Sequence, residues 1–172
     1  MIRGSARVLQ IGVIGEGTCS RRTAALARRV GTAVAKSGAA LCSGGLGGVM
    51  EAASRGAAEA GGVVVGILPG FRRQEANRWV TVPIVTGMDQ ARNVVLVRSC
   101  DALIAVGGMY GTLSEIALAL KLGVPVVGLG TWRLRQPAGR PVPIIRVATP
   151  EAAVVRALRA ARTSRRARGR LP

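Results

Sequence analysis

The sequence predicts a single α/β domain of the Rossmann type, with a doubly wound, mostly parallel sheet of about six to seven strands and helices on both faces. Short apolar runs alternate with helical segments of about ten residues or more, which is the order of βαβ units. The runs are apolar throughout, as in strands buried on both faces. The 172 residues are 49% hydrophobic but only 2% aromatic, so one core of small aliphatic side chains is expected.

The first strand and helix open the chain. Val8–Ile14 is a continuous apolar run that ends at the turn Gly15-Glu16-Gly17. Arg21–Ser37 follows with small and aliphatic residues at helical spacing, which predicts an inner face. Ala39–Cys42 is a second short apolar strand. The turn Ser43–Gly48 leads from it into a helix from about Val49 to Ala60.

The middle of the chain continues the alternation. Gly62–Leu68 is an apolar strand stopped by Pro69-Gly70, where proline and glycine favour a turn. Arg72–Arg78 is a polar loop, and Val80–Val85 is extended. Met88–Ser99 predicts a helix that carries Val94, Val95 and Val97.

The last third adds three strands and two helices. Ala102–Val106 is a strand that opens into the turn Gly107–Gly111, and a helix runs from about Leu113 to Leu122. Val124–Leu129 and Ile144–Val147 are strands separated by the loop Gly130–Pro141. Thr149-Pro150-Glu151 has the cap-then-proline form that begins a helix. We expect the domain to span 1–161 and the arginine-rich residues 162–172 to form a basic, flexible tail.

Two features of the composition exclude whole classes of site. The chain has no histidine, which excludes a Ser-His-Asp or Cys-His arrangement and any imidazole metal ligand. Its three cysteines, Cys19, Cys42 and Cys100, show no CxxC spacing, so we expect no disulfide framework, no metal site and small buried thiols. Only eight residues are acidic, which leaves few candidates for a catalytic carboxylate.

The net charge of +17 comes mostly from arginine, since only Lys36 and Lys121 among the 25 basic residues are lysines. Such a charge favours polyanions. Outside the tail the arginines are scattered, and few aromatic residues are interleaved with them to stack on bases. A solvated surface biased toward arginine therefore explains the charge better than nucleic-acid binding, which stays open for Arg156–Arg170.

No apolar run reaches the ~18 to 20 residues that a membrane-spanning helix needs. The first residues lead directly into the first strand, without the charged segment and cleavage site of a leader. We expect a cytoplasmic protein without a membrane partner.

Three glycine-rich turns predict where a ligand binds. Each joins a strand to a helix, and in a parallel sheet such turns meet at the carboxyl edge of the strands. Helix N-termini there present N–H groups, and glycine lets a phosphate approach them. The sequence therefore predicts a site for a phosphorylated small molecule. Its glycines are Gly15, Gly17, Gly44, Gly45, Gly47, Gly107, Gly108 and Gly111.

None of the three turns is a standard nucleotide motif. No Gly-Lys-Ser/Thr follows any of them, and Gly15–Ser20 lacks the third glycine of G-x-G-x-x-G. A nicotinamide or ATP-hydrolysing enzyme is therefore not expected. Neither lysine lies at the ligand edge, which argues against a pyridoxal-phosphate enzyme, and we expect no cofactor.

The stretch Gly107–Glu115 (GGMYGTLSE) resembles the PGGxGTxxE signature of the LOG ("lonely guy") family. Residues 43–62, 65–70 and 88–108 strengthen the resemblance, which covers Ile11 to Leu129. The chain looks most like short bacterial LOG-like proteins, often labelled lysine decarboxylases or molybdenum-cofactor-carrier-like proteins.

The resemblance implies hydrolysis of the N-glycosidic bond of a nucleoside 5′-monophosphate, with Arg92 and Glu115 as the catalytic residues. A carboxylate can stabilise the positive charge that develops on the ribose. Gly107–Thr112 would take the 5′-phosphate, and Tyr110 could stack on the base or only line the turn. Members of the family are usually homodimers or higher homo-oligomers, and the helix Met88–Ser99 would suit such an interface.

The chain also departs from the family pattern. Met109 stands in place of the second signature glycine and would obstruct the phosphate turn, and Gly107 stands in place of its proline. Asp89 and Asn93 replace the basic and imidazole-bearing neighbours of the arginine. A non-catalytic binder or carrier of a nucleotide or of molybdenum cofactor is therefore the alternative function.

Simpler interpretations exist for the two candidate catalytic residues. Thr112-x-x-Glu115 fits a capping box, in which Thr112 caps the helix and Glu115 bonds back to the cap. Arg92 would have no role if it lay on an exposed helix face. Glu51 and Asp101 are expected to act locally, at a helix start and beside a strand.

Overall fold

The structure is a computed structural model that describes residues 7–168, with the backbone alone for residues 165–168. Seven strands form one sheet: β1 (Gln10–Gly15), β2 (Ala40–Ser43), β3 (Val64–Leu68), β4 (Val82–Val85), β5 (Ala102–Val106), β6 (Val126–Leu129) and β7 (Ile144–Val147). The helices are α1 (Arg21–Lys36), α2 (Val49–Glu59), α3 (Arg92–Ser99), α4 (Tyr110–Lys121) and α5 (Pro150–Arg168), with short 3-10 turns η1 (Arg73–Glu75) and η2 (Asp89–Ala91).

All seven strands are parallel and lie in the order β4-β3-β2-β1-β5-β6-β7. The predicted doubly wound α/β sheet is confirmed. The chain builds outward from β1 to β4 and then returns to place β5 on the other side of β1, with Ile11 beside Ala102. The order of strands therefore reverses between β1 and β5, which is where ligands bind in sheets of this kind.

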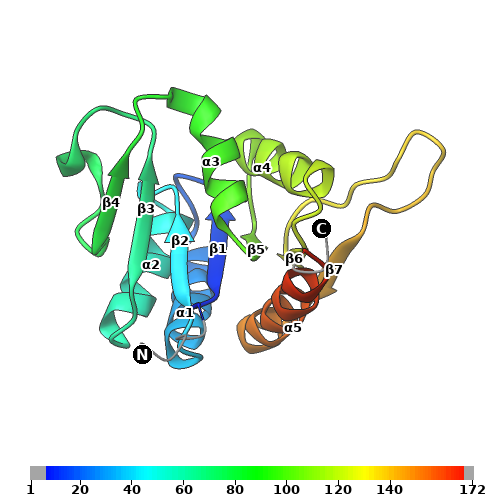
Figure 1. Cartoon of the computed structure of the whole chain (residues 1–172), viewed down its shortest axis with the longest axis horizontal. Coiled ribbons are helices and arrows are strands. Elements are labelled where there is room, and N and C mark those ends of the chain that lie inside the picture. The colour runs from blue at the N-terminus through cyan, green and yellow to red at the C-terminus, as the bar shows by residue number, and fades with distance from the viewer. Residues whose placement is uncertain (1–6, 169–172) are drawn as a thin grey trace, which may run out of the picture.

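Each face of the sheet has its own apolar core. Helices α1, α2 and α5 cover one face and bury Ala27, Val30, Ala53 and Ala157 against it. Helices α3 and α4 cover the other face and bury Leu96 and Ile116. Figure 1 shows this arrangement, with the loop between β6 and β7 projecting from one side of the molecule.

Helices α1 and α2 pack closely because glycine stands at both contact points. A Cβ at Gly31 would run into the backbone carbonyl of Ala53, and a Cβ at Gly56 into that of Arg28. The Thr32 hydroxyl also donates to the Gly56 carbonyl at 3.0 Å. This close packing sets how the two helices leave the carboxyl edge of β1 and β2.

Three predicted boundaries were wrong. The helix expected at Met88–Ser99 begins as the 3-10 turn η2, where Asp89 has φ 47°, and becomes α-helical only at Arg92. Helix α4 begins at Tyr110 and not near Leu113. Helix α5 continues past Ala161 to Arg168, so the predicted tail is helical over 162–168, and residues 169–172 of that tail lie outside the described residues.

Within residues 7–168, no helix is both long enough and apolar enough to cross a membrane.

Candidate ligand-binding site

The three predicted glycine turns meet at Glu16. Its carboxylate Oε2 accepts a hydrogen bond from the Gly108 backbone N–H at 3.1 Å, which joins the turns after β1 and β5. Its backbone carbonyl accepts from the Val49 N–H at 3.0 Å, which joins the turns after β1 and β2. The convergence of the turns at one edge of the sheet is confirmed.

The third turn needs glycine at two consecutive positions. Gly107 has φ 58° and Gly108 has φ 120°, values that side chains with a Cβ rarely adopt. A Cβ at Gly108 would also lie 2.6 Å from the Thr112 Cγ2 atom. Glycine at both positions therefore allows this backbone conformation, in which the Gly107 N–H donates to the Leu129 carbonyl and the Gly108 N–H donates to Glu16.

The second turn holds Arg92 on one side and Asn77 on the other. A Cβ at Gly44 would lie 2.5 Å from the Arg92 Nη2 atom, so glycine makes room for the guanidinium. The Gly45 carbonyl accepts from the Asn77 backbone N–H at 2.8 Å and from its side-chain amide at 3.1 Å. Gly47 faces the first turn, where its Cβ would lie 3.2 Å from the Gly17 carbonyl oxygen.

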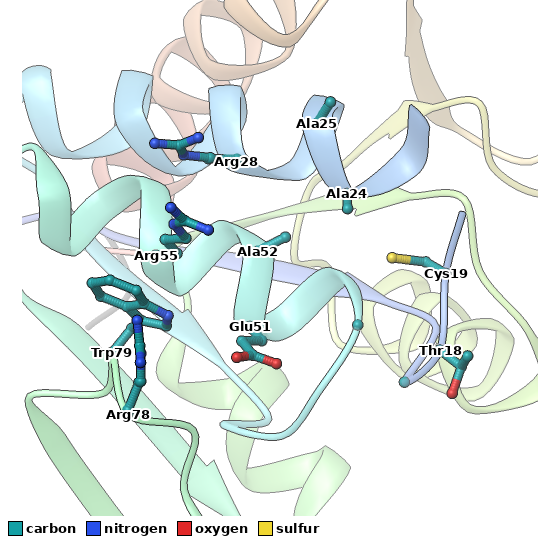
Figure 2. Close-up of a pocket in the computed structure, with 12 residues that line it drawn as sticks. Thr18, Cys19, Ala24, Ala25, Arg28, Glu51, Ala52, Arg55, Arg78 and Trp79 are labelled. Carbon is teal, nitrogen blue, oxygen red and sulfur yellow. The ribbon is translucent and has the colours of Figure 1, made fainter. Parts of the chain in front are cut away.

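A cleft of about 570 Å³ opens at the first two turns, at Gly17 and Gly48, and continues along the seam between α1 and α2, and no residue of the third turn is among those that line it. Gly17, Thr18, Cys19 and Gly48 line one end, and Arg55, Arg78 and Trp79 line the other. Figure 2 shows Thr18 and Cys19 far from Trp79, with Glu51 between them. This volume falls within the range of small-molecule sites.

Two arginine side chains lie against the Trp79 indole at the far end of the cleft. The Arg78 guanidinium lies 4.7 Å and that of Arg55 5.5 Å from the Trp79 ring centre. Arg28 and Arg55 both bond to Glu59, and these pairs hold their side chains at the cleft wall. The result is a positively charged, partly aromatic surface that favours an anionic or planar ligand.

Arg92 and Glu115 form a buried ion pair on the α3 and α4 side of the sheet. Arg92 Nη1 lies 3.3 Å from Glu115 Oε1 and donates to Asn93 Oδ1 at 2.8 Å. Their side chains are 9% and 8% exposed, so the interpretation of Arg92 as an exposed helix residue was wrong. The pair is not among the residues that line the cleft.

Burial dominates the electrostatics of this pair. It raises the pKa of the Glu115 carboxyl from 4.5 to about 7, although the attraction of Arg92 opposes the rise. It also lowers the pKa of the Arg92 guanidinium. The Arg92 Nε atom is buried without a hydrogen-bond partner among the described residues.

The capping-box interpretation of Thr112 and Glu115 was wrong. Helix α4 has Met109 as its N-cap residue, with no side-chain hydrogen bond to the cap, and Glu115 bonds to Arg92. Thr112 lies inside the first turn, where it is 2% exposed. Its hydroxyl has no hydrogen-bond partner within the described part of the chain.

The other residues of the third turn are exposed. Met109 has φ −109° and is 59% exposed, so its backbone does not need the positive φ that a glycine would supply there. Tyr110 is 76% exposed, and its ring centre lies 6.1 Å from that of Trp132. Gly111 has open space around it. Stacking of Tyr110 on a base remains a prediction.

The cysteines behave as small residues. Cys42 and Cys100 are buried, and Cys19 is partly buried at the cleft. Burial and the negative charge of Glu16 raise the pKa of the Cys19 thiol, which keeps it protonated. In the described residues, the His, Cys, Asp and Glu side chains form no cluster that could hold a metal ion.

The structure brings the predicted glycines together and adds residues that sequence reasoning missed. Gly15 ends β1, where a Cβ would press on Val49, and this contact keeps the first two turns close. Glu16, Asn77 and the Trp79 end of the cleft were not predicted. An acid between two glycines was the available signal for Glu16, but its partner Gly108 lies 92 residues away. Glu51 is exposed at the start of α2 and lines the cleft, and Asp101 accepts from the Gln10 N–H at 2.9 Å.

Comparison with known proteins gives a family match over most of the chain. The model described as the SLOG cluster4 family matches residues 8–154. An uncharacterized protein of Archaeoglobus fulgidus is 52% identical over 123 residues, which are 72% of this chain and 81% of that protein.

Solved structures give matches over nearly the full chain. The molybdenum cofactor binding protein from the phototrophic bacterium Rippkaea orientalis is 34% identical, with a TM-score of 0.80 over 91% of this chain and 98% of that one. The molybdenum cofactor carrier protein from Chlamydomonas reinhardtii is 35% identical, with a TM-score of 0.76 over 90% and 98%. DNA processing protein A from Helicobacter pylori, 16% identical with a TM-score of 0.64 over 88% and 80%, shares the fold alone.

Proposed function

This chain belongs to the SLOG cluster4 family, and from that premise we propose that it binds a phosphorylated small molecule, with a phosphorylated pterin such as molybdenum cofactor as its cargo. The observation that carries the proposal is the convergence of three glycine turns at Glu16, at the point where the order of strands reverses. N–H groups at such a point are suited to a phosphate.

The cleft supports a ligand that extends beyond its phosphate. It begins at Gly17 and Gly48, beside the turns, and ends at Trp79 with its two arginines. A planar ring system placed along it would meet an aromatic and cationic surface. The relatives named for molybdenum cofactor binding and carriage favour a pterin over a nucleotide.

Equilibrium binding tests the proposal directly. Purified protein is mixed with molybdenum cofactor freshly released from a molybdoenzyme, or with AMP, and passed through a desalting column before molybdenum and phosphorus are measured in the protein fraction. We expect retained molybdenum with phosphorus in equal amounts. No retention of either ligand contradicts the proposal.

Two glycine variants distinguish an effect at the ligand site from the general effect of backbone strain. Gly107→Ala forces a side chain onto φ 58° at the third turn, whereas Gly139→Ala forces one onto φ 78° in the loop between β6 and β7. Both positions have space for the added carbon, or nearly so. We expect only Gly107→Ala to lose ligand, by roughly tenfold or more, because strain at this position shifts the neighbouring Gly108 N–H that would hold the phosphate.

A second candidate function is hydrolysis of a nucleoside 5′-monophosphate to free base and ribose 5-phosphate. The buried Arg92–Glu115 pair favours it, because a carboxyl with a pKa of about 7 can hold or release a proton near neutral pH. In this role Glu115 would stabilise the positive ribose and orient water, and Arg92 would position the nucleotide.

Release of base from AMP, followed by chromatography, tests this activity. Glu115→Gln keeps the size and polarity of the side chain but removes the charge. We expect it to slow hydrolysis by on the order of 10²-fold or more. If the unmodified protein releases no base from the common monophosphates above background, the candidate is rejected and the binding function stands alone.

Self-association forms part of the proposal. Exposed apolar side chains on β4 and α3, in the loop after β3 and just before η2 support a homo-oligomeric contact: Phe71, Ile84, Val85, Met88 and Val94. A face of this kind favours a partner of similar character. Sedimentation velocity is expected to give a dimer or larger species that Phe71→Asp with Met88→Asp converts to monomer, and a monomeric unmodified protein contradicts it.

A further inference from the structure

The third glycine turn already holds a negative charge supplied by the chain itself. Glu16 Oε2 accepts from the Gly108 N–H at 3.1 Å, and Glu16 Oε1 lies 3.3 Å from where a Cβ of Gly107 would be. The carboxylate therefore lies against both positive-φ glycines of the turn. A ligand phosphate that approaches this turn meets an N–H that is already paired.

We propose that the Glu16 carboxylate competes with the ligand phosphate for the Gly108 N–H and thereby sets the phosphate affinity of the site. The inference rests on the proposed phosphate-binding function. It assigns a role in determining specificity to Glu16, which is not among the residues predicted from the sequence to bind the ligand. A phosphate binds here only if the Glu16 side chain moves away, or if the phosphate binds beside the carboxylate at the cost of repulsion between the two negative charges.

The cost of the competition follows from population arithmetic. If the carboxylate occupies the N–H in most molecules, the apparent affinity for phosphate is the intrinsic affinity multiplied by the fraction of molecules in which the N–H is free. A hydrogen bond to a charged acceptor is strong enough to lower that fraction by on the order of 10- to 100-fold. Weaker binding suits a protein that must pass its ligand on.

The side chain and backbone of Glu16 have separate roles, which makes the side chain testable. The backbone carbonyl accepts from Val49 N–H and orients the start of α2, and substitution of the side chain leaves it in place. The residue is only partly buried, so a shorter side chain leaves no large cavity. Variants at this position are therefore expected to fold.

The test compares Glu16→Ala and Glu16→Gln with a charge-matched control, Glu75→Gln. Glu75 lies in the turn η1, where it pairs with Arg72 and is not among the residues lining the cleft. Binding of AMP and of inorganic phosphate is measured by calorimetry for each full-length protein. The control reports what loss of one negative charge does without any change at Gly108.

We expect Glu16→Ala to bind both probes about 10-fold tighter or more, Glu16→Gln to fall between it and the unmodified protein, and Glu75→Gln to change little. Amide hydrogen exchange gives a second readout: Gly108 should exchange faster in Glu16→Ala, and phosphate should slow it again. Exchange at Gly108 that is unchanged in Glu16→Ala overturns the inference.

Failure of this inference differs from failure of the proposed function. Phosphate binding by the unmodified protein with no gain in either Glu16 variant, or a gain equal to that of Glu75→Gln, refutes competition and leaves the binding function intact. Absence of binding in the unmodified protein and in every variant refutes both. Binding that appears only when Glu16 is replaced supports competition by Glu16 and contradicts the proposed function of the unmodified protein.

Discussion

Glu115 meets its cation through a single pair of atoms, Arg92 Nη1 and Glu115 Oε1, 3.3 Å apart. A forked contact would add a second bond and offset more of the cost of burial. With one contact, burial prevails and raises the pKa of the carboxyl to about 7. The folded protein therefore binds a proton at Glu115 more tightly than the unfolded chain does.

The pH dependence of stability follows because the pKa of Glu115 is higher in the folded protein than in the unfolded chain. The stability that Glu115 contributes is fully present below about pH 4.5 and is lost as the pH rises through about 7. Urea denaturation at pH 5 and at pH 8 gives the free energy of unfolding of the unmodified protein and of Glu115→Gln. The unmodified protein should lose stability relative to the variant between pH 5 and pH 8. The shift is at most about 3 kcal/mol. A difference independent of pH contradicts it.

Gly44 is the residue that gives Arg92 its place. In Gly44→Ala the new Cβ would lie 2.5 Å from Arg92 Nη2 and 2.7 Å from the Met50 sulfur. Because Arg92 is buried, it has little room to move, and we expect a loss of about 1 to 3 kcal/mol in unfolding free energy. Gly17→Ala, where nothing lies within 4 Å of the added carbon, is the matched control. Equal stability of the two variants contradicts the steric account.

At the scale of elements, the close approach of α1 and α2 shapes the cleft. The wall residues Arg28 and Arg55 stand on these two helices and meet at Glu59. Their separation depends on Gly31 and Gly56, which remove the Cβ atoms at the contact. Any change that spreads the helices therefore separates Arg28 on α1 from Glu59 on α2 and alters the cleft wall.

Gly56→Ala tests that dependence. The added carbon would run into the Arg28 backbone, so we expect a loss of about 1 to 3 kcal/mol in unfolding free energy and weaker ligand binding. Gly111→Ala, in the first turn of α4 with open space around it, should be neutral or slightly stabilising, by up to about 1 kcal/mol. Thermal melts of both variants decide the matter. A Gly56→Ala protein as stable as the control contradicts the packing argument.

Secondary structure was predictable where the signal is local. The apolar runs identified all seven strands to within a few residues. The inner strands such as β5 and β6 are apolar because both of their faces are buried, whereas β4, at the edge of the sheet, is apolar although its side chains are largely exposed. The start of α4 was missed, since Gly108 and Gly111 suggest one turn although Gly111 already lies in the helix. The break at Asp89 was missed because the helix Met88–Ser99 was predicted from its valines. These valines all follow Asp89 and carry no information about the backbone there.

Long-range contacts were beyond sequence reasoning. The glycine turns could be placed at one edge because parallel strands share that edge. The hydrogen bond from Gly108 to Glu16 and the pairing of Arg92 with Glu115 depend on how distant segments pack. The motif supplied Arg92 and Glu115 through family resemblance, whereas Glu16 has no such signature.

At the scale of the whole molecule, the described end of α5 adds charge and little core. Ala161 is fully buried, but none of the side chains at 162–164 is buried. A chain ending at Ala161 should therefore keep its melting temperature within a few degrees. A large drop would show that the residues beyond it dock on the core. Calorimetry of the two chain lengths makes the comparison.

The same shortened chain tests the role of the basic C-terminus in polyanion binding. On single-stranded DNA, each phosphate contact steepens the slope of log affinity against log salt by about 0.7. If the residues after Ala161 bind nucleic acid, the full chain should show a steeper slope than the shortened one on single-stranded DNA. Equal slopes assign any binding to the folded domain.

The central place of β1 has a consequence for synthesis on the ribosome. Ile11 pairs with Ala102, so one edge of β1 has no partner until about ninety further residues have emerged. At ordinary elongation rates that interval is roughly 5 to 20 seconds, and an unpaired apolar strand edge attracts other chains. We expect nascent chains stalled before β5 to be captured by chaperones and cut by protease, and those stalled well after β5 to resist both.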